Sequence, residues 1–238
     1  MPALSSEAAR AYRSADLPRP RTPWQEVTFS VIDFETTGLE PATDEIISFA
    51  TVTVAGGRVR VDDARYELVR PDRMPDADTI RIHGLREQDL SDAAPLAERI
   101  DGLLEAITGR ALVAHVASVE HGFLEAALSP RGIRLRNPIV DTAALARELR
   151  RLRRDPPVRD PIGLPDLARS LGLPVHRSHH ADGDALTTAQ AFIALASHLE
   201  AFRPQTLGSL TQLSLQGGNK RPSARALLRR FVSGRGGT

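Results

Sequence analysis

The chain has 238 residues, enough for one sizeable domain with tails, and its 31 basic and 30 acidic residues leave a formal net charge of +1. It contains no cysteine, which excludes disulfides, thiolate catalysis and cysteine-ligated zinc. No apolar run approaches the ~20 residues that span a bilayer and the N-terminus lacks a signal-peptide core, so we expect a cytoplasmic protein without a membrane partner.

The first elements are strands. Residues 1–24 are mostly small, polar or charged and include closely spaced prolines, which predicts a flexible lead-in with Trp24 docking on the core. Strand-like runs follow at 27–32, 45–54 and 58–69, and Gly56-Gly57 between the last two predicts a hairpin. Apolar residues at helical spacing then predict a helix over 89–108.

The second half of the chain alternates strands and helices. Strands are predicted at 111–114 and 139–141, and helices at 120–128, 142–152, 164–171 and 185–202. An antiparallel start followed by this alternation predicts an α/β domain over 25–202, with a mixed sheet flanked by helices. Residues 203–238 are basic and contain no acid, which predicts a flexible tail; a phosphate-binding arm is the alternative.

Two acids end the first strand-like run. Asp33 and Glu35 are spaced i, i+2, so in a strand they point to the same face. Like charges this close repel unless a cation lies between them, and carboxylate pairs suit Mg²⁺ or Mn²⁺. The pair predicts a metal site, although a solvent-exposed strand end would also explain it.

Two later segments place acids at helix starts. Glu120 follows the strand at 111–114, and Asp184 follows a loop that contains His179. A loop histidine near carboxylates can act as a general base. Charge complementarity at a helix start and local capping are the simpler explanations for these acids. Zinc binding by His176, His179 and His180 is a further alternative, without a fixed zinc spacing to support it.

Together, four carboxylates and a histidine meet the needs of a two-metal phosphoryl-transfer site. The residues also resemble DEDDh-type 3′–5′ exonucleases of the DnaQ-like superfamily, which includes the proofreading subunit of bacterial replicative polymerase. The motif over 33–39 is a specific match, and His179-x-Ala181-x-x-Asp184-Ala185 matches in spacing and residue type. Segments 82–85, 140–142 and 164–168 support the resemblance, which covers about 27–200.

The resemblance implies a ribonuclease-H-like fold, two Mg²⁺ or Mn²⁺ ions, and release of nucleoside monophosphates from nucleic acid 3′ ends. A DNA polymerase is an additional candidate partner. By position, the resemblance gives metal ligands, a catalytic base and residues that contact the terminal nucleotide. The metal ligands are Asp33, Glu35, Glu120 and Asp184, the base is His179, and the nucleotide contacts are Thr36, Leu39, Ile82 and His83.

The second motif departs from the family pattern. Val116 replaces the usual asparagine, Val119 the usual aromatic residue, and Glu120 the usual metal-binding aspartate. Glutamate is one methylene longer, and a misplacement of ~1 Å can cost about 10²-fold in rate. Three interpretations follow: Glu120 reaches a metal from a helix set slightly back, the enzyme is slow or prefers Mn²⁺, or the fold serves only for binding.

Three functions therefore compete. The first is a metal-dependent 3′–5′ exonuclease, with DNA as the favoured substrate. The second is a non-catalytic module that binds nucleic acid or a polymerase. The third is an exonuclease for RNA or short oligonucleotides. The chain has only seven Phe, two Tyr and one Trp, which favours gripping of the last nucleotides over extended base stacking.

Overall fold

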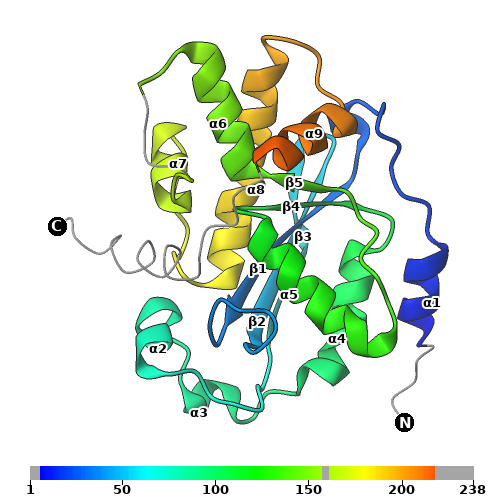
Figure 1. Ribbon diagram of the computed structural model, residues 1–238, viewed down its shortest axis with the longest axis vertical. Helices are drawn as coiled ribbons and strands as arrows, with labels where there is room; N and C mark the ends of the chain where they lie inside the picture. The colour runs from blue at the N-terminus through cyan, green and yellow to red at the C-terminus, as the bar shows by residue number, and fades with distance from the viewer. Residues whose placement is uncertain (1–5, 157–160, 218–238) are drawn as a thin grey trace.

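A five-stranded mixed sheet forms the centre of the protein (Figure 1). The computed structural model describes residues 6–156 and 161–217. The strand order is β3-β2-β1-β4-β5; β1 to β3 are antiparallel, while β4 and β5 run parallel to β1. The strands are β1 (Phe29–Thr36), β2 (Ile46–Ala55), β3 (Arg58–Leu68), β4 (Ala111–Ala114) and β5 (Ile139–Asp141). The predicted α/β class with a mixed sheet is confirmed.

Helices cover both faces of this sheet (Figure 1). They are α1 (Glu7–Ser14), α2 (Ala77–His83), α3 (Glu87–Leu90), α4 (Leu96–Ile107), α5 (Ser118–Leu128), α6 (Thr142–Arg153), α7 (Leu164–Ser170), α8 (Ala181–Glu200) and α9 (Leu207–Gly217). Short 3₁₀ turns lie at Trp24–Glu26 and Ser129–Arg131. Among these described helices, none combines the length and the apolar character needed to cross a bilayer.

Alternation along β1 separates the two cores. Phe29 and Val31 face the cluster under α8, whereas Ile32 belongs to the cluster under α4. On the α8 side, the ring of Phe192 packs edge-on against Phe29, with centroids 4.7 Å apart, and against Trp24 at 5.8 Å. These buried rings fix α8 across β1, so the first turn of α8 meets the C-terminal end of that strand.

Several boundaries differ from the prediction. The helix expected over 89–108 is two helices, because Pro95 precedes α4 and the residue before a proline avoids helical backbone. The short helix α2 was not predicted; Asp76 caps its start and Gly84, at φ 79°, ends it. Helix α8 begins at Ala181, four residues earlier than expected, so Asp184 lies in its first turn rather than opening it.

The expected lead-in is not irregular throughout. Helix α1 places Ala9 and Tyr12 in the core beside α4, and the Tyr12 hydroxyl donates to the side chain of Asn137 at 2.6 Å. The expectation of a flexible segment is therefore wrong for Glu7–Ser14, which forms a helix with buried Ala8, Ala9 and Tyr12. The predicted docking of Trp24 is confirmed, since this side chain is 2% exposed.

The expected tail also begins with structure. Leu207 and Leu210 of α9 are buried, and α9 packs against α6 and β5, so a flexible tail is the wrong description of this helix. Burial of these leucines stabilises a segment whose lack of acids had suggested disorder. The rest of the predicted basic tail, 218–238, lies outside the described residues, as do 157–160 of the proline-rich loop. The domain limits 25 and 202 stay predictions.

Candidate active site

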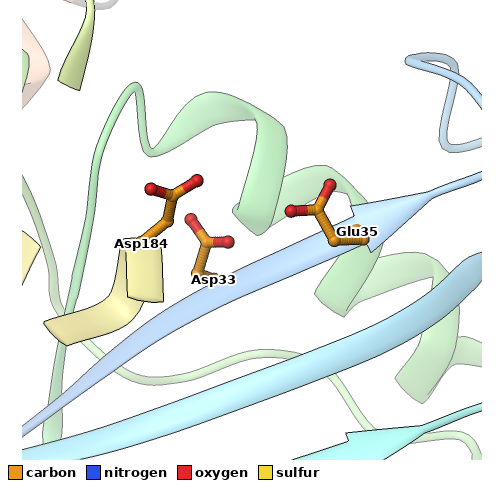
Figure 2. A group of neighbouring side chains, drawn as sticks. All are labelled: Asp33, Glu35 and Asp184. Carbon is orange, nitrogen blue, oxygen red and sulfur yellow. The ribbon is translucent and has the colours of Figure 1, made fainter. Parts of the chain in front are cut away.

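Three carboxylates meet where β1 passes the start of α8. Asp33 and Glu35 lie on the face of β1 that α8 covers, and Asp184 reaches toward them from the first turn of α8 (Figure 2). One carboxylate oxygen from each of the three lies within 4.8 Å of the others. The predicted pairing of the first and third motifs in space is therefore observed.

Burial and mutual repulsion make this cluster electrostatically unfavourable without a cation. Burial raises the pKa of Asp33 well above its usual range, and the charges of Asp184 and Glu35 raise it further. The pKa of Glu35 rises to about 8 for the same reasons, and burial raises the pKa of Asp184 to about 7. A divalent cation would remove this penalty, so the donor set fits Mg²⁺ or Mn²⁺.

Glu120 lies in the cleft wall beside this cluster. It occupies the first turn of α5, its residue is 7% exposed, and its Oε2 atom has no hydrogen-bond partner in the described part of the chain. Burial raises the pKa of Glu120 to about 8, and the charge of Asp141 adds to the shift. Its oxygens are not among those that gather within 4.8 Å. An unsatisfied buried carboxylate fits a role toward a cation, but the ligand role of Glu120 stays a prediction.

His179 shapes the third motif through its backbone. Its N–H donates to Oδ2 of Asp184 at 2.9 Å, and its φ of 62° turns the loop sharply into α8. The loop also needs Gly183, because a Cβ there would lie 2.6 Å from the carbonyl oxygen of Arg177. The half-buried His179 side chain lines the cleft, and its role as a general base stays a prediction.

The residues predicted to contact a nucleotide line the same cleft, which has a volume of about 490 Å³. Among them, His83 is 2% exposed, and its Nδ1 accepts the N–H of Leu85 at 2.9 Å. Nε2 must then carry the hydrogen in the neutral ring, and it has no partner among the described residues. Burial lowers the pKa of His83 to about 4, and His180 and His179 lower it further. His83 is thus a neutral ring whose unpartnered Nε2–H is buried behind the cleft surface.

All nine predicted site residues line this cleft, namely Asp33, Glu35, Thr36, Leu39, Ile82, His83, Glu120, His179 and Asp184. Their individual functional roles stay predictions. The zinc alternative finds no support, because the potential metal ligands that come together in the described chain are Asp33, Glu35 and Asp184. Instead, Nε2 of His176 lies 3.1 Å from the side-chain oxygen of Gln190.

Sequence reasoning assigned no role to the residues that hold the second motif. Val116 has φ 61°, and its N–H donates to Oδ1 of Asp141 at 3.0 Å; the same oxygen caps α6 through the N–H of Ala143. His115 lies 2.9 Å from both the Thr142 hydroxyl and the Ile162 carbonyl, so it ties β4 to the cleft wall. The Val140-Asp141-Thr142 segment was the only sequence signal for this arrangement.

The fold and the cleft agree with a comparison to known families. The family described as Exonuclease (RNase_T) matches residues 30–192. The chain belongs to this exonuclease family. The DnaQ-like resemblance is thereby confirmed, and the chain carries a DnaQ-like 3′–5′ exonuclease domain with a candidate acidic metal site.

Curated relatives of this exonuclease domain include replicative polymerase chains. It is 31% identical over 189 residues to a DNA polymerase III PolC-type from Thermotoga maritima, a match covering 79% of this chain and 13% of that protein. It is 32% identical over 177 residues to a DNA polymerase III subunit epsilon from Treponema pallidum, covering 73% and 79% of the two chains. The chain thus corresponds to a small part of the PolC-type relatives.

Solved structures establish the fold. Exonuclease X in complex with 5′ overhanging duplex DNA aligns with a TM-score of 0.60 at 24% identity, over 77% of this exonuclease domain's chain and 99% of that chain. E. coli Exonuclease I in complex with a dA16 oligonucleotide aligns with a TM-score of 0.65 at 17% identity, over 74% of this chain and 42% of that chain. The predicted ribonuclease-H-like fold is confirmed.

Proposed function

We propose that this chain is a divalent-metal-dependent 3′–5′ exonuclease that releases nucleoside monophosphates from nucleic acid, with DNA as the favoured substrate. The observation that carries the proposal is the half-buried group of Asp33, Glu35 and Asp184, with one oxygen from each within 4.8 Å of the others. Burial and mutual repulsion disfavour this group as bare carboxylates, and bound Mg²⁺ or Mn²⁺ ions would offset this penalty.

Bound ions would neutralise the developing charge of the phosphoryl group and acidify an attacking water, as in other two-metal sites. Asp33, Glu35 and Asp184 would hold the ions, and Glu120, whose Oε2 has no partner among the described residues, would be a further ligand. The His179 side chain accepts the proton of the attacking water. Its backbone bond to Asp184 keeps the base and a metal ligand in fixed relation.

The four other predicted site residues in the same cleft would bind the terminal nucleotide. Leu39 and Ile82 supply apolar contact, and Thr36 organises the turn by donating to the carbonyl of Gly38. The Nε2–H of His83 is buried and has no partner among the described residues, and it would donate to a nucleotide oxygen only if the cleft wall moved to uncover it. DNA is favoured because the relatives are DNA polymerase III proteins, and those relatives also make a DNA polymerase the partner to test first.

The test is a gel assay on 5′-labelled single-stranded and 3′-recessed DNA with Mg²⁺, Mn²⁺ or EDTA. We expect a ladder that shortens from the 3′ end, lost in EDTA and in Asp33→Ala. Asp62→Ala is the matched control, because Asp62 is an exposed acid on β3 outside the cleft. Activity that survives both EDTA and Asp33→Ala would falsify the proposal.

A non-catalytic binding module is the second candidate, and the position of Glu120 favours it. Glu120 is longer than the usual aspartate and lies outside the group of three gathered oxygens. This module would bind nucleic acid with a steep salt dependence and release no product with either metal. Glu120→Asp separates the two functions, because it should raise the rate of a weakened enzyme and leave a pure binder inactive.

An RNA or short-oligonucleotide exonuclease is the remaining alternative. Discrimination between RNA and DNA depends on contacts to the 2′-hydroxyl. A matched RNA ladder in the same gel decides it: faster shortening of RNA than of DNA would replace the DNA assignment.

A further inference from the structure

The cleft has a marked imbalance of charge. Its described lining residues include five carboxylates, those of Asp33, Glu35, Glu120, Asp166 and Asp184. Among those described lining residues, Arg169 is the one whose side chain carries a permanent positive charge. Nucleic acid carries one negative charge per phosphate, and cations of the protein bind these phosphates. Apart from bound metal ions, Arg169 is therefore the charged group of the described cleft lining that can bind a phosphate.

Arg169 lies on the exposed part of the cleft wall. It belongs to α7, whose first residues Leu164 and Pro165 also line the cleft, and α7 packs beside α8 (Figure 1). The Arg169 side chain is 66% exposed, whereas the carboxylates on β1 and α8 are half-buried. A phosphate bound by Arg169 would therefore lie at the solvent-exposed part of the cleft wall.

Arg169 already holds an anionic group that a phosphate can replace. Its Nη1 lies 2.9 Å from Oδ1 of Asp166, one turn earlier on α7, and the Asp166 side chain is 75% exposed. An exposed ion pair at i, i+3 contributes little stability, so it exchanges readily. Guanidinium groups bind phosphate and carboxylate oxygens with the same geometry, so the two anions compete for Arg169.

Resting on the proposed function, we propose that Arg169 binds a backbone phosphate upstream of the scissile linkage, and that Asp166 competes with this phosphate. In the substrate complex, the guanidinium donates to a non-bridging phosphate oxygen instead of to Asp166. Arg169 positions the strand that enters the cleft and takes no part in the chemical step.

Steady-state kinetics on a single-stranded DNA oligonucleotide test the two residues. Arg169→Ala should raise KM about fivefold with little change in kcat, the signature of lost uniform binding. Arg169→Lys should recover part of this loss, and Asp166→Asn should lower KM about twofold, because the competing charge is gone. The slope of log(kcat/KM) against log[salt] should become shallower by about 0.7 in Arg169→Ala.

The matched control is Arg81→Ala. Arg81 pairs with Asp78 at the same i, i+3 spacing on α2, and their side chains are 71% and 66% exposed. Neither residue lines the cleft, so the variant should keep the KM of the wild type. Equal KM values for Arg169→Ala and Arg81→Ala would overturn the proposal.

Neutral linkages identify the phosphate. Oligonucleotides carry a single methylphosphonate at the second or third linkage from the 3′ end. At one of these positions, the neutral linkage should raise KM for the wild type and leave KM for Arg169→Ala unchanged. If the neutral linkage raises KM by the same factor in the wild type and in Arg169→Ala at both positions, Arg169 contacts neither phosphate.

Two measurements separate the absence of exonuclease activity from the absence of a phosphate contact at Arg169. A wild-type protein that forms no product with Mg²⁺ or Mn²⁺ refutes the exonuclease activity. Fluorescence anisotropy of the same labelled oligonucleotide then tests Arg169 without turnover. Weaker binding by Arg169→Ala than by Arg81→Ala supports the phosphate contact, and equal binding refutes it.

Discussion

Replacing Val116 tests whether the second motif stores backbone strain. Val116 has φ 61°, in the left-handed region where a β-branched side chain clashes with the backbone. This conformation costs roughly 1–2 kcal/mol for a residue with a Cβ, and asparagine tolerates it much better. We therefore expect Val116→Asn to increase the free energy of unfolding by about 1 kcal/mol.

The surrounding contacts hold Val116 in this conformation. Its N–H donates to Asp141 at 3.0 Å, and its carbonyl accepts the N–H of Val119 at 3.1 Å. Both bonds involve the backbone, so asparagine can keep them. Val116→Gly should gain less than asparagine, because glycine loses about 0.5–1 kcal/mol more conformational entropy on folding.

Thermal unfolding of the metal-free protein by circular dichroism measures the effect. A gain of 1 kcal/mol raises Tm by roughly 2–4 °C for a domain of this size. Val61→Asn is the control, because Val61 is a 64% exposed residue of β3 without a positive φ and should gain nothing. If neither Val116→Asn nor Val116→Gly raises Tm, the turn is not strained and the reasoning is wrong.

Three further predictions follow from burial. Because the pKa values of Glu35 and Asp184 are raised to about 8 and 7, the folded metal-free protein keeps protons that the unfolded chain releases. Its free energy of unfolding should therefore fall as pH rises from about 5 to 8, and each unit of pKa shift is equivalent to ~1.4 kcal/mol. Mg²⁺ or Mn²⁺ should raise Tm most at the alkaline end of this range. A Tm in EDTA that does not change with pH would contradict the prediction. The pKa of His83 is lowered to about 4, so the stability that its neutral ring contributes is present above pH 6.5 and is lost as pH falls toward 4. In urea titrations, the free energy of unfolding should therefore fall less between pH 7 and pH 5 in His83→Gln than in the wild type. Equal decreases in the two proteins would argue against a buried neutral ring. Phe192→Ala should lower the free energy of unfolding in urea by about 3–5 kcal/mol. Phe202→Ala, at a 51% exposed position, should change it by no more than about 0.5 kcal/mol. Similar decreases in both variants would mean that Phe192 does not hold α8 on β1.

Local pattern in the sequence determined the frame of the fold. Alternating apolar residues and turn glycines predicted the strands, and helical spacing predicted the longer helices, because these periods follow from backbone geometry alone. The acids of the first and third motifs were predicted for the same reason. Two carboxylates at i, i+2 share a face of a strand wherever that strand lies, and an acid at a helix start is visible in sequence.

Short elements escaped prediction because their stability comes from contacts. Helix α2 has seven residues, too few for a periodic signal, and depends on the Asp76 cap. Helices α1 and α9 lie in segments whose composition suggests disorder, yet buried Tyr12 and Leu210 attach them to α4 and to α6 and β5. Such contacts join residues far apart in the chain, which no local window contains.

Tertiary structure alone decided the distances that matter for chemistry. The packing of Phe192 on Phe29 brings Asp184 to Asp33, whereas Glu120, on α5, lies outside the group of three gathered oxygens. The neutral donor state of His83 and the cleft position of Arg169 also depend on neighbours remote in sequence. The sequence determined which residue types are available, and packing of the sheet against its helices determined which of them meet, because burial and ångström-scale geometry belong to the folded chain as a whole.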